Sequence, residues 1–235
     1  MIQKIGITER GDPALDKRWI PWVREGKPAI LITKAPGVLA SMLQEPEMPR
    51  EPNIIVHATI TGYGGTVLEP HVPVMEHSFA GYKALIDFLG SDRVVLRVDP
   101  IILTQKGLAL AERTIIDVKK INPASRVRIS FLDMYDHVKQ RFTDAGLPLP
   151  QETFHAPQQQ RWNAWKNLGE PELCGEPGMP NIPCISAKDC EILGVQPVLG
   201  EFQQRKTCGC LGNKHELLTN RYRCPHSCLY CFWRD

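Results

Sequence analysis

The run Ile54-Ile55-Val56-His57-Ala58-Thr59-Ile60 is the strongest strand signal in the chain, and the turn Thr61-Gly62-Tyr63-Gly64-Gly65 follows it directly. A short, nearly continuous apolar run that ends in turn residues is typical of a strand buried on both faces. Such strands occur in parallel sheets covered by helices. This stretch therefore predicts an α/β fold.

Strand and helix patterns alternate on both sides of this run. The other strand candidates are residues 2–8, 29–33, 93–98 and 126–131. The helix candidates are residues 13–25, 38–43, 74–89, 108–121 and 134–145. Alternation of this kind means βα units joined by right-handed crossovers. We therefore expect residues 1–147 to form a partial (β/α) barrel of five or six parallel strands.

The pattern changes after residue 147. Residues 148–169 contain the prolines of a linker and a helix candidate at 158–168. Residues 170–235 are rich in glycine, proline and cysteine, with one short helix candidate at 187–193, and predict an irregular extension that completes the active site. This extension cannot bury much apolar surface. A bound metal would explain how it folds, because metal-binding energy then becomes folding energy.

All eight cysteines of the 235-residue chain lie in this extension. The N-terminus lacks a signal-peptide pattern, so the cysteines predict metal or redox chemistry in the cytoplasm rather than disulfides. No apolar run is long enough to span a bilayer, and we expect no membrane partner. The formal net charge of +2 excludes a strong field for binding polyanions but allows local basic patches.

Cys224, Cys228 and Cys231 form a C-x3-C-x2-C motif, with Tyr230 directly before the last cysteine. A [4Fe–4S] cluster normally takes four thiolates, so three would leave one iron open. An open coordination position distinguishes a catalytic metal site from a structural one. The competing interpretation is zinc, because Cys228 and Cys231 are spaced as half of a zinc ribbon, and Cys224 or His226 could contribute to it.

A second set of cysteines precedes this motif: Cys174, Cys184, Cys190, Cys208 and Cys210. The last two flank a glycine, whose flexibility lets both sulfurs reach one metal centre. With Cys174 and either Cys184 or Cys190 they supply four thiolates. Four thiolates suit an auxiliary [4Fe–4S] cluster or a structural zinc ion.

Every strand candidate ends in polar residues, and in a barrel of βα units the chemistry takes place at these carboxyl ends. The candidate catalytic residues are Arg10, Lys34, Arg97 and Asp99. Their cations could bind a carboxylate or a phosphate, because arginine matches such groups with two hydrogen bonds. Alternatively, Arg97 and Asp99 pair with each other as a structural bridge.

Three further features each allow two interpretations. The turn Thr61-Gly62-Tyr63-Gly64 could let its backbone approach a cofactor closely, or it could be a tight loop without a ligand. Glu69 could bind a ribose hydroxyl or be an exposed loop acid. His57, on the apolar strand, is more often a hydrogen-bonded core histidine than a ligand.

Several stretches resemble an uncharacterised radical SAM-like family of bacteria and phages. They are residues 8–13, 33–36, 59–63, 69–73, 97–100, 130–131 and 208–210, together with the terminal motif. Members of that family carry a label that likens them to DNA photolyase and spore photoproduct lyase, and their cysteine motif also ends the chain. The resemblance favours Cys184 over Cys190 in the second set.

The resemblance implies a radical SAM enzyme with a (β/α) barrel. The terminal cluster would bind S-adenosylmethionine (SAM) and cleave it to a 5′-deoxyadenosyl radical. Tyr230 and the turn at Thr61 to Gly64 would then contact SAM, and flavodoxin or ferredoxin would supply electrons. The label implies a nucleobase substrate, such as a pyrimidine base in DNA that is repaired or modified. The alternatives are a zinc-stabilised nucleic-acid-binding or interaction module without catalysis, and an iron–sulfur electron-transfer protein without SAM.

Overall fold

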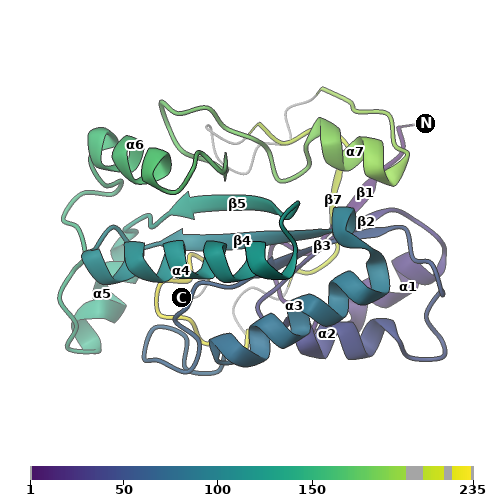
Figure 1. The fold of residues 1–235 in the computed structure, drawn as a ribbon, viewed down its shortest axis with the longest axis horizontal. Coiled ribbons are helices and arrows are strands. Elements are labelled where there is room, and N and C mark those ends of the chain that lie inside the picture. Colours follow the sequence, from purple (N-terminus) through teal and green to yellow (C-terminus); the bar gives the residue numbers. More distant parts are fainter. Residues whose placement is uncertain (1, 200–208, 220–223, 234–235) are drawn as a thin grey trace.

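The computed structural model describes residues 2–199, 209–219 and 224–233 (Figure 1). Its centre is a sheet of seven strands in the order β6-β5-β4-β3-β2-β1-β7, and every neighbouring pair is parallel. The sheet curls into a half barrel. The strands are β1 (Ile5–Ile7), β2 (Ala29–Thr33), β3 (Ile54–Thr59), β4 (Val94–Ile101), β5 (Arg126–Phe131), β6 (Glu172–Leu173) and β7 (Lys214–Glu216).

Helices connect the strands in the manner of βα units. The α-helices are α1 (Ile20–Arg24), α2 (Pro36–Leu43), α3 (Met75–Leu89), α4 (Gln105–Ile121), α5 (Asp136–Asp144), α6 (Gln158–Asn167) and α7 (Ala187–Leu193). Two 3-10 helices, η1 (Lys17–Trp19) and η2 (Ser91–Arg93), precede α1 and β4. Within the described residues, no helix is long and apolar enough to cross a membrane.

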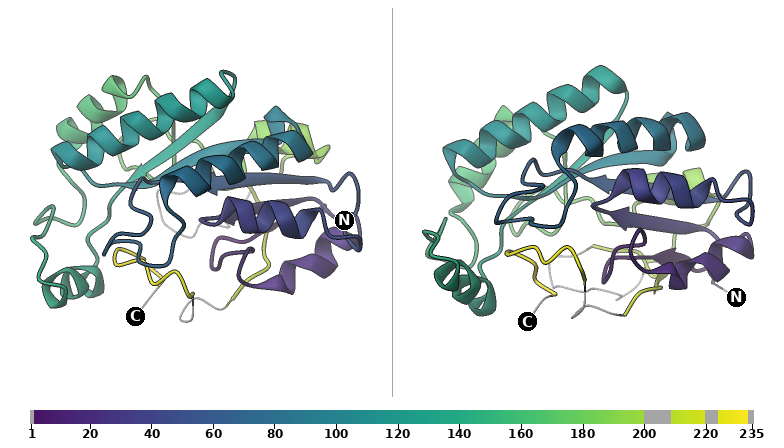
Figure 2. Two further views of the ribbon diagram at one scale, coloured as in Figure 1. Left: turned by 60° about the horizontal axis from the view of Figure 1, so that its bottom comes forward. Right: turned by 90° about the horizontal axis from the view of Figure 1, so that it is seen from below.

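The two faces of the sheet bury different partners. Alternate strand residues such as Leu31 and Val56 pack into the larger core, which includes buried residues of α2, α3 and α4. Figure 2 shows these three helices together on one side of the sheet. The intervening residues, such as Ile30 and Ile55, pack against the cysteine-bearing segment that contains α7. The concave face is therefore covered by the C-terminal part of the chain.

The predicted α/β class and partial barrel are confirmed, and the five strand candidates correspond to β1–β5. The predicted number of five or six strands is wrong, because β6 and β7 add to the sheet. Both arise in the region that we expected to be irregular, and they span only two and three residues. Strands this short carry no readable alternation, and partners far away in the sequence hold them. Arg128 Nη2 lies 2.6 Å from Glu172 Oε2 in β6.

One helix prediction is also too long. The expected helix at residues 13–25 is confined to η1 and α1, because residues 12–16 form a turn in which the Asp12 carbonyl accepts the backbone N–H groups of Leu15 and Asp16. Asp16 then caps η1 by accepting the backbone N–H of Arg18. The other predicted helices agree with the structure to within three residues at each end.

Candidate active site

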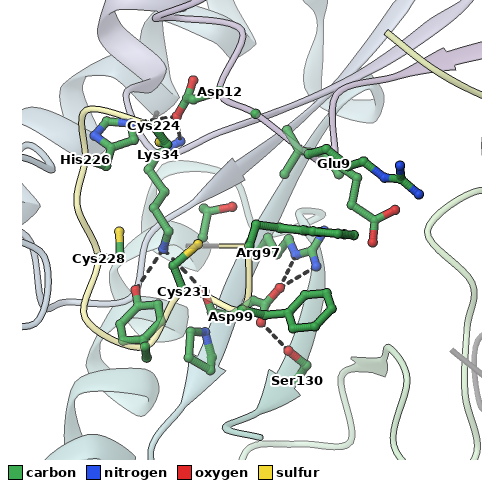
Figure 3. Close-up of a pocket in the computed structure, with 18 of the residues that line it drawn as sticks. Glu9, Asp12, Lys34, Arg97, Asp99, Ser130, Cys224, His226, Cys228 and Cys231 are labelled. Carbon is green, nitrogen blue, oxygen red and sulfur yellow. Dashed lines mark hydrogen bonds and ion pairs between the residues drawn. The ribbon is translucent and has the colours of Figure 1, made fainter. Parts of the chain in front are cut away.

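A cavity of about 210 Å³ opens at the carboxyl ends of β1–β5 (Figure 3). The terminal segment, residues 224–233, forms part of its wall. The lining residues from the strand ends include Glu9, Arg10, Lys34, Arg97, Asp99 and Ser130, and those from the terminal segment include Cys224, Cys228, Tyr230, Cys231 and Trp233. All four predicted catalytic residues therefore share one cavity with the three cysteines of the terminal motif.

The three cysteines of the terminal motif are partly or fully shielded from solvent. Cys228 is buried, whereas Cys224 and Cys231 are half-buried. Burial raises the pKa of the Cys224 thiol to about 11 and that of the Cys228 thiol to about 12. Without a metal these two thiols are protonated near neutral pH. Metal binding would therefore displace their protons.

His226 lies beside these cysteines, but its imidazole is held by residues of other loops. Its Nε2 lies 2.7 Å from Asp12 Oδ2, and its Nδ1 lies 3.1 Å from the carbonyl oxygen of His71. Asp12 is itself fixed, because Thr33 Oγ1 and the Lys34 backbone N–H donate to its carboxylate. Both ring nitrogens of His226 thus contact oxygen atoms rather than the cysteine sulfurs. The terminal site therefore offers three thiolates rather than a cysteine–histidine set.

Lys34 places a positive charge among these groups. Its Nζ lies 2.7 Å from Glu69 Oε1 and 2.9 Å from the Tyr230 hydroxyl, which also donates to Glu69. Burial alone would lower the pKa of Lys34, but the Glu69 carboxylate and the nearby Cys228 outweigh it, so the pKa lies above its usual value. Glu69 is buried, so its interpretation as an exposed loop acid is wrong.

Arg97 and Asp99 do pair, as the structural alternative predicted. Arg97 Nε donates to Asp99 Oδ2 over 2.7 Å, and Ser130 Oγ donates to the other carboxylate oxygen. Nevertheless, Arg97 Nη1 and Arg10 Nε are buried and have no hydrogen-bond partner among the described residues. The Arg10 guanidinium stacks 5.1 Å above the centre of the Trp233 ring. The cavity wall thus keeps cationic donors next to an aromatic surface.

The glycine turn behaves differently from its cofactor-binding prediction. Thr61, Gly62, Tyr63 and Gly64 do not line this cavity. A Cβ at Gly64 would lie 2.0 Å from the Pro73 carbonyl oxygen, and Gly62 has a φ of +83°. Glycine is therefore required by the loop itself, which favours the tight-loop alternative. The turn reaches the site only indirectly, because Thr61 Oγ1 donates to Glu69 Oε2 over 2.8 Å.

A second group of cysteines lies on the concave face of the sheet. The Sγ atoms of Cys174 and Cys184 are 3.3 Å apart, and Cys210 lies within hydrogen-bonding reach of Cys184. Cys190 is packed into the same apolar cluster from α7. Cys208, a predicted ligand, lies outside the described residues. Among the residues that the structure describes, no three His, Cys, Asp or Glu side chains are already arranged as metal ligands.

A buried ion network that the sequence patterns did not predict lies beside this second group. Arg128 of β5 is fully buried and donates to Glu172 Oε2 and to the Cys184 carbonyl oxygen. Arg126 pairs with Asp189 over 2.8 Å. Two arginines at positions i and i+2 of one strand point to the same face. That spacing on a strand expected to be buried could have indicated carboxylate partners.

The prediction for His57 was only partly correct. The side chain is fully buried on β3, as expected of a core histidine. However, neither ring nitrogen has a hydrogen-bond partner among the described residues. Burial, followed by the charge of Arg128, lowers the pKa of His57 to about 3. His57 is therefore a neutral imidazole enclosed by the sheet.

Comparison with known proteins gives a family without an assigned activity. No curated protein and no solved structure matches the chain. A family model described as a domain of unknown function matches residues 25–233, which include the cavity residues from Lys34 onward and the terminal motif. This match covers far more than half of the sequence, and the chain belongs to the family named Domain of unknown function (DUF1848).

Proposed function

We propose that the protein is a radical SAM-like iron–sulfur enzyme of the cytoplasm, with its active site in the cavity at the carboxyl ends of β1–β5. The observation that carries the proposal is the convergence of Cys224, Cys228 and Cys231 on this cavity while His226 is held by Asp12 and His71. Three thiolates without a fourth local ligand suit a [4Fe–4S] cluster with one open iron.

A cluster bound there would supply the electron that cleaves SAM reductively, with flavodoxin or ferredoxin as its donor class. The protein's own residues would bind and orient the reactants. Lys34, fixed by Glu69 and Tyr230, keeps a positive charge next to Cys228 and would offset the negative charge of thiolates and SAM carboxylate. Asp99, held by Arg97 and Ser130, is a fixed acceptor in the same cavity.

The substrate part of the proposal is a nucleobase carried by an anionic backbone, such as a pyrimidine in DNA. Arg10 and Arg97 retain buried donors that could bind phosphate, and Trp233 and Phe232 offer stacking surfaces at the cavity. Trp162 lies in α6, packs against the larger core and does not line the cavity. Base contact would therefore involve aromatic residues of the cavity lining, such as Trp233 and Phe232.

SAM cleavage tests the proposal directly. Protein purified without oxygen is reduced with dithionite in the presence of SAM, and 5′-deoxyadenosine is measured by mass spectrometry. The wild type should form it, and Cys228→Ala should form none. Cys190→Ala is the matched control, because Cys190 is a buried cysteine that does not line the cavity, and it should retain the activity. Cleavage by Cys228→Ala, or none by an iron-loaded wild type, would refute the assignment.

DNA binding separates the substrate part from the chemistry. Titration of the reconstituted protein with single- and double-stranded DNA should give an affinity that falls as salt rises, because phosphate contacts release counterions. Arg10→Gln should weaken binding at low salt. An absent or salt-insensitive interaction would contradict a DNA substrate and leave SAM cleavage untouched. DNA binding by a colourless zinc protein would instead support the non-catalytic binding module.

A further inference from the structure

We propose that Cys174, Cys184 and Cys210 bind a single zinc ion on the concave face of the sheet, separate from the terminal site. This inference does not depend on the proposed function. The three residues come from different places in the chain, since Cys174 follows β6, Cys184 precedes α7 and Cys210 precedes β7. All three side chains are nevertheless buried in one apolar cluster.

The sulfur spacing favours one metal ion over a four-iron cluster. Two thiolates on a tetrahedral zinc, with Zn–S bonds of ~2.3 Å, stand ~3.8 Å apart. In a [4Fe–4S] cluster each thiolate extends from its own iron, which separates the sulfurs by roughly 6 Å. The Cys174 and Cys184 Sγ atoms are 3.3 Å apart. A small opening of this pair would admit zinc, whereas a cluster would require the two segments to move apart.

The surroundings hold the pair in place independently of any metal. The backbone N–H of Cys174 donates to the carbonyl of Ile129 in β5 over 3.0 Å. The carbonyl of Cys184 accepts from Arg128 Nη1 over 3.2 Å. Ser186 and Asp189 form a capping box that begins α7 two residues after Cys184. Two thiols fixed this way lose little conformational freedom when they bind an ion.

Buried cations surround the same sulfurs. Arg97 and Arg128 are both close enough to Cys174 and Cys184 to interact electrostatically with them. Thiolates bound to zinc carry negative charge, and a buried charge requires a nearby opposite charge. Arg97 also lines the active-site cavity. The zinc ion would therefore lie behind the cavity wall and keep the segment that covers the concave face in position.

Such an ion would stabilise the segment that covers the concave face, which is otherwise held to the sheet by little backbone pairing. Its strands β6 and β7 are two and three residues long, so their backbone pairing contributes little. One ion that joins the end of β6, the residues before α7 and the residues before β7 would convert metal-binding energy into folding energy. The fourth position of the tetrahedron is left to a further ligand.

Metal analysis of matched variants tests the inference. Zinc, iron and sulfide are measured in anaerobically purified wild type, Cys184→Ala, Cys228→Ala and Cys190→Ala. We expect about one zinc per chain in the wild type, lost in Cys184→Ala but retained in the other two. Iron should follow Cys228 instead. Iron and sulfide lost together with Cys184 would identify a second cluster and overturn the inference, as would zinc that is retained in Cys184→Ala.

A second measurement covers the case in which Cys184→Ala does not fold. The wild type is alkylated with iodoacetamide before and after treatment with a zinc chelator, and each cysteine is quantified by mass spectrometry. Cys174, Cys184 and Cys210 should become reactive only after the chelator, and Cys190 should not respond to it. Equal reactivity before and after treatment, or a Cys174–Cys184 disulfide in the untreated protein, would refute the zinc site. Loss of iron from the terminal site would not change the result of this alkylation experiment. A failure of the proposed function can therefore be told apart from a failure of the zinc inference.

Discussion

The two cysteine groups differ in their access to solvent and in what surrounds them. Cys184 and Cys210 are 1% and 2% exposed and lie beneath the segment that covers the concave face. Cys224 and Cys231 are half-buried and line an open cavity. The inner group consists of Cys174, Cys184 and Cys210, and Arg128 ties it to β5 through the Cys184 carbonyl. The terminal group consists of Cys224, Cys228 and Cys231. It shares its cavity with Arg10 and Arg97, which keep buried N–H groups without a hydrogen-bond partner among the described residues. The same residue type therefore suits a structural ion in one place and a reactive centre in the other.

The largest expected contrast is in stability. Cys184→Ala should lower the free energy of unfolding by about 3 kcal/mol or more, because the variant loses an ion that joins three segments. Cys228→Ala should lower it by less, about 1–2 kcal/mol, because Cys228 is buried but its segment contributes no described strand to the sheet. Urea unfolding of both variants measures the contrast. Equal losses would remove the distinction between a structural and a reactive group.

His57 can show whether water reaches the concave face. Its pKa in the folded protein is about 3, whereas the ordinary pKa of histidine is 6.5. As pH falls below 6.5, the unfolded chain binds a proton that the folded protein does not. Stability therefore falls between pH 6.5 and about 3, and this group should account for about 3 kcal/mol by pH 4.

His57→Leu should remove this part of the acid sensitivity. Exposed His77→Leu is the control and should retain it. Urea unfolding of the three proteins at several pH values between 4 and 7 gives the comparison. A His57→Leu profile that parallels the wild type would mean that the imidazole is solvated or hydrogen-bonded, and that the inner region is not dry.

A smaller effect should follow from weakening the anchor of the inner group. Arg128 donates through two nitrogens to Glu172 and through a third to the Cys184 carbonyl. Lysine has a single nitrogen, so Arg128→Lys should cost about 2 kcal/mol in the free energy of unfolding. The control is Arg113→Lys, whose arginine is 64% exposed on α4, and it should change little. Thermal unfolding that does not distinguish these variants would contradict an anchoring role.

The smallest effect is expected at the terminal group. Tyr230→Phe removes the hydroxyl that contacts Lys34 and Glu69, but those two residues still pair over 2.7 Å. The loss in global stability should be about 0.5–1 kcal/mol. Hydrogen exchange should show faster opening confined to the terminal segment. Faster exchange throughout β1–β5 would show that this segment supports the whole fold, as we expect only of the inner group.

Sequence patterns predicted the sheet where local signals were sufficient. Ile54–Thr59 is buried at every position, so its apolar run is readable without tertiary information. The strand-end residues Arg10, Lys34 and Arg97 could be predicted to lie close together, because parallel strands bring their carboxyl ends to one edge of the sheet. The terminal cysteines reach that edge too, as the motif and the family resemblance suggested.

The remaining features depend on partners far apart in the sequence. β6 and β7 are held by partners far away in the sequence: β6 pairs with β5, whose Arg128 binds Glu172, and β7 pairs with β1. The hydrogen-bond partners of His226 could not be predicted from its motif, since Asp12 and His71 lie in other loops. Likewise, the contact between Cys174 and Cys184 depends on where β6 and α7 lie on the concave face.

Electron paramagnetic resonance tests the central claim most directly, because it observes the cluster and its open iron together. Anaerobic protein is reduced with dithionite and measured with and without SAM. We expect a signal from a reduced [4Fe–4S] cluster that changes shape when SAM is added, and that is absent from Cys228→Ala but present in Cys190→Ala. A protein that contains zinc alone, or a cluster signal that SAM leaves unchanged, would contradict the assignment of the terminal site.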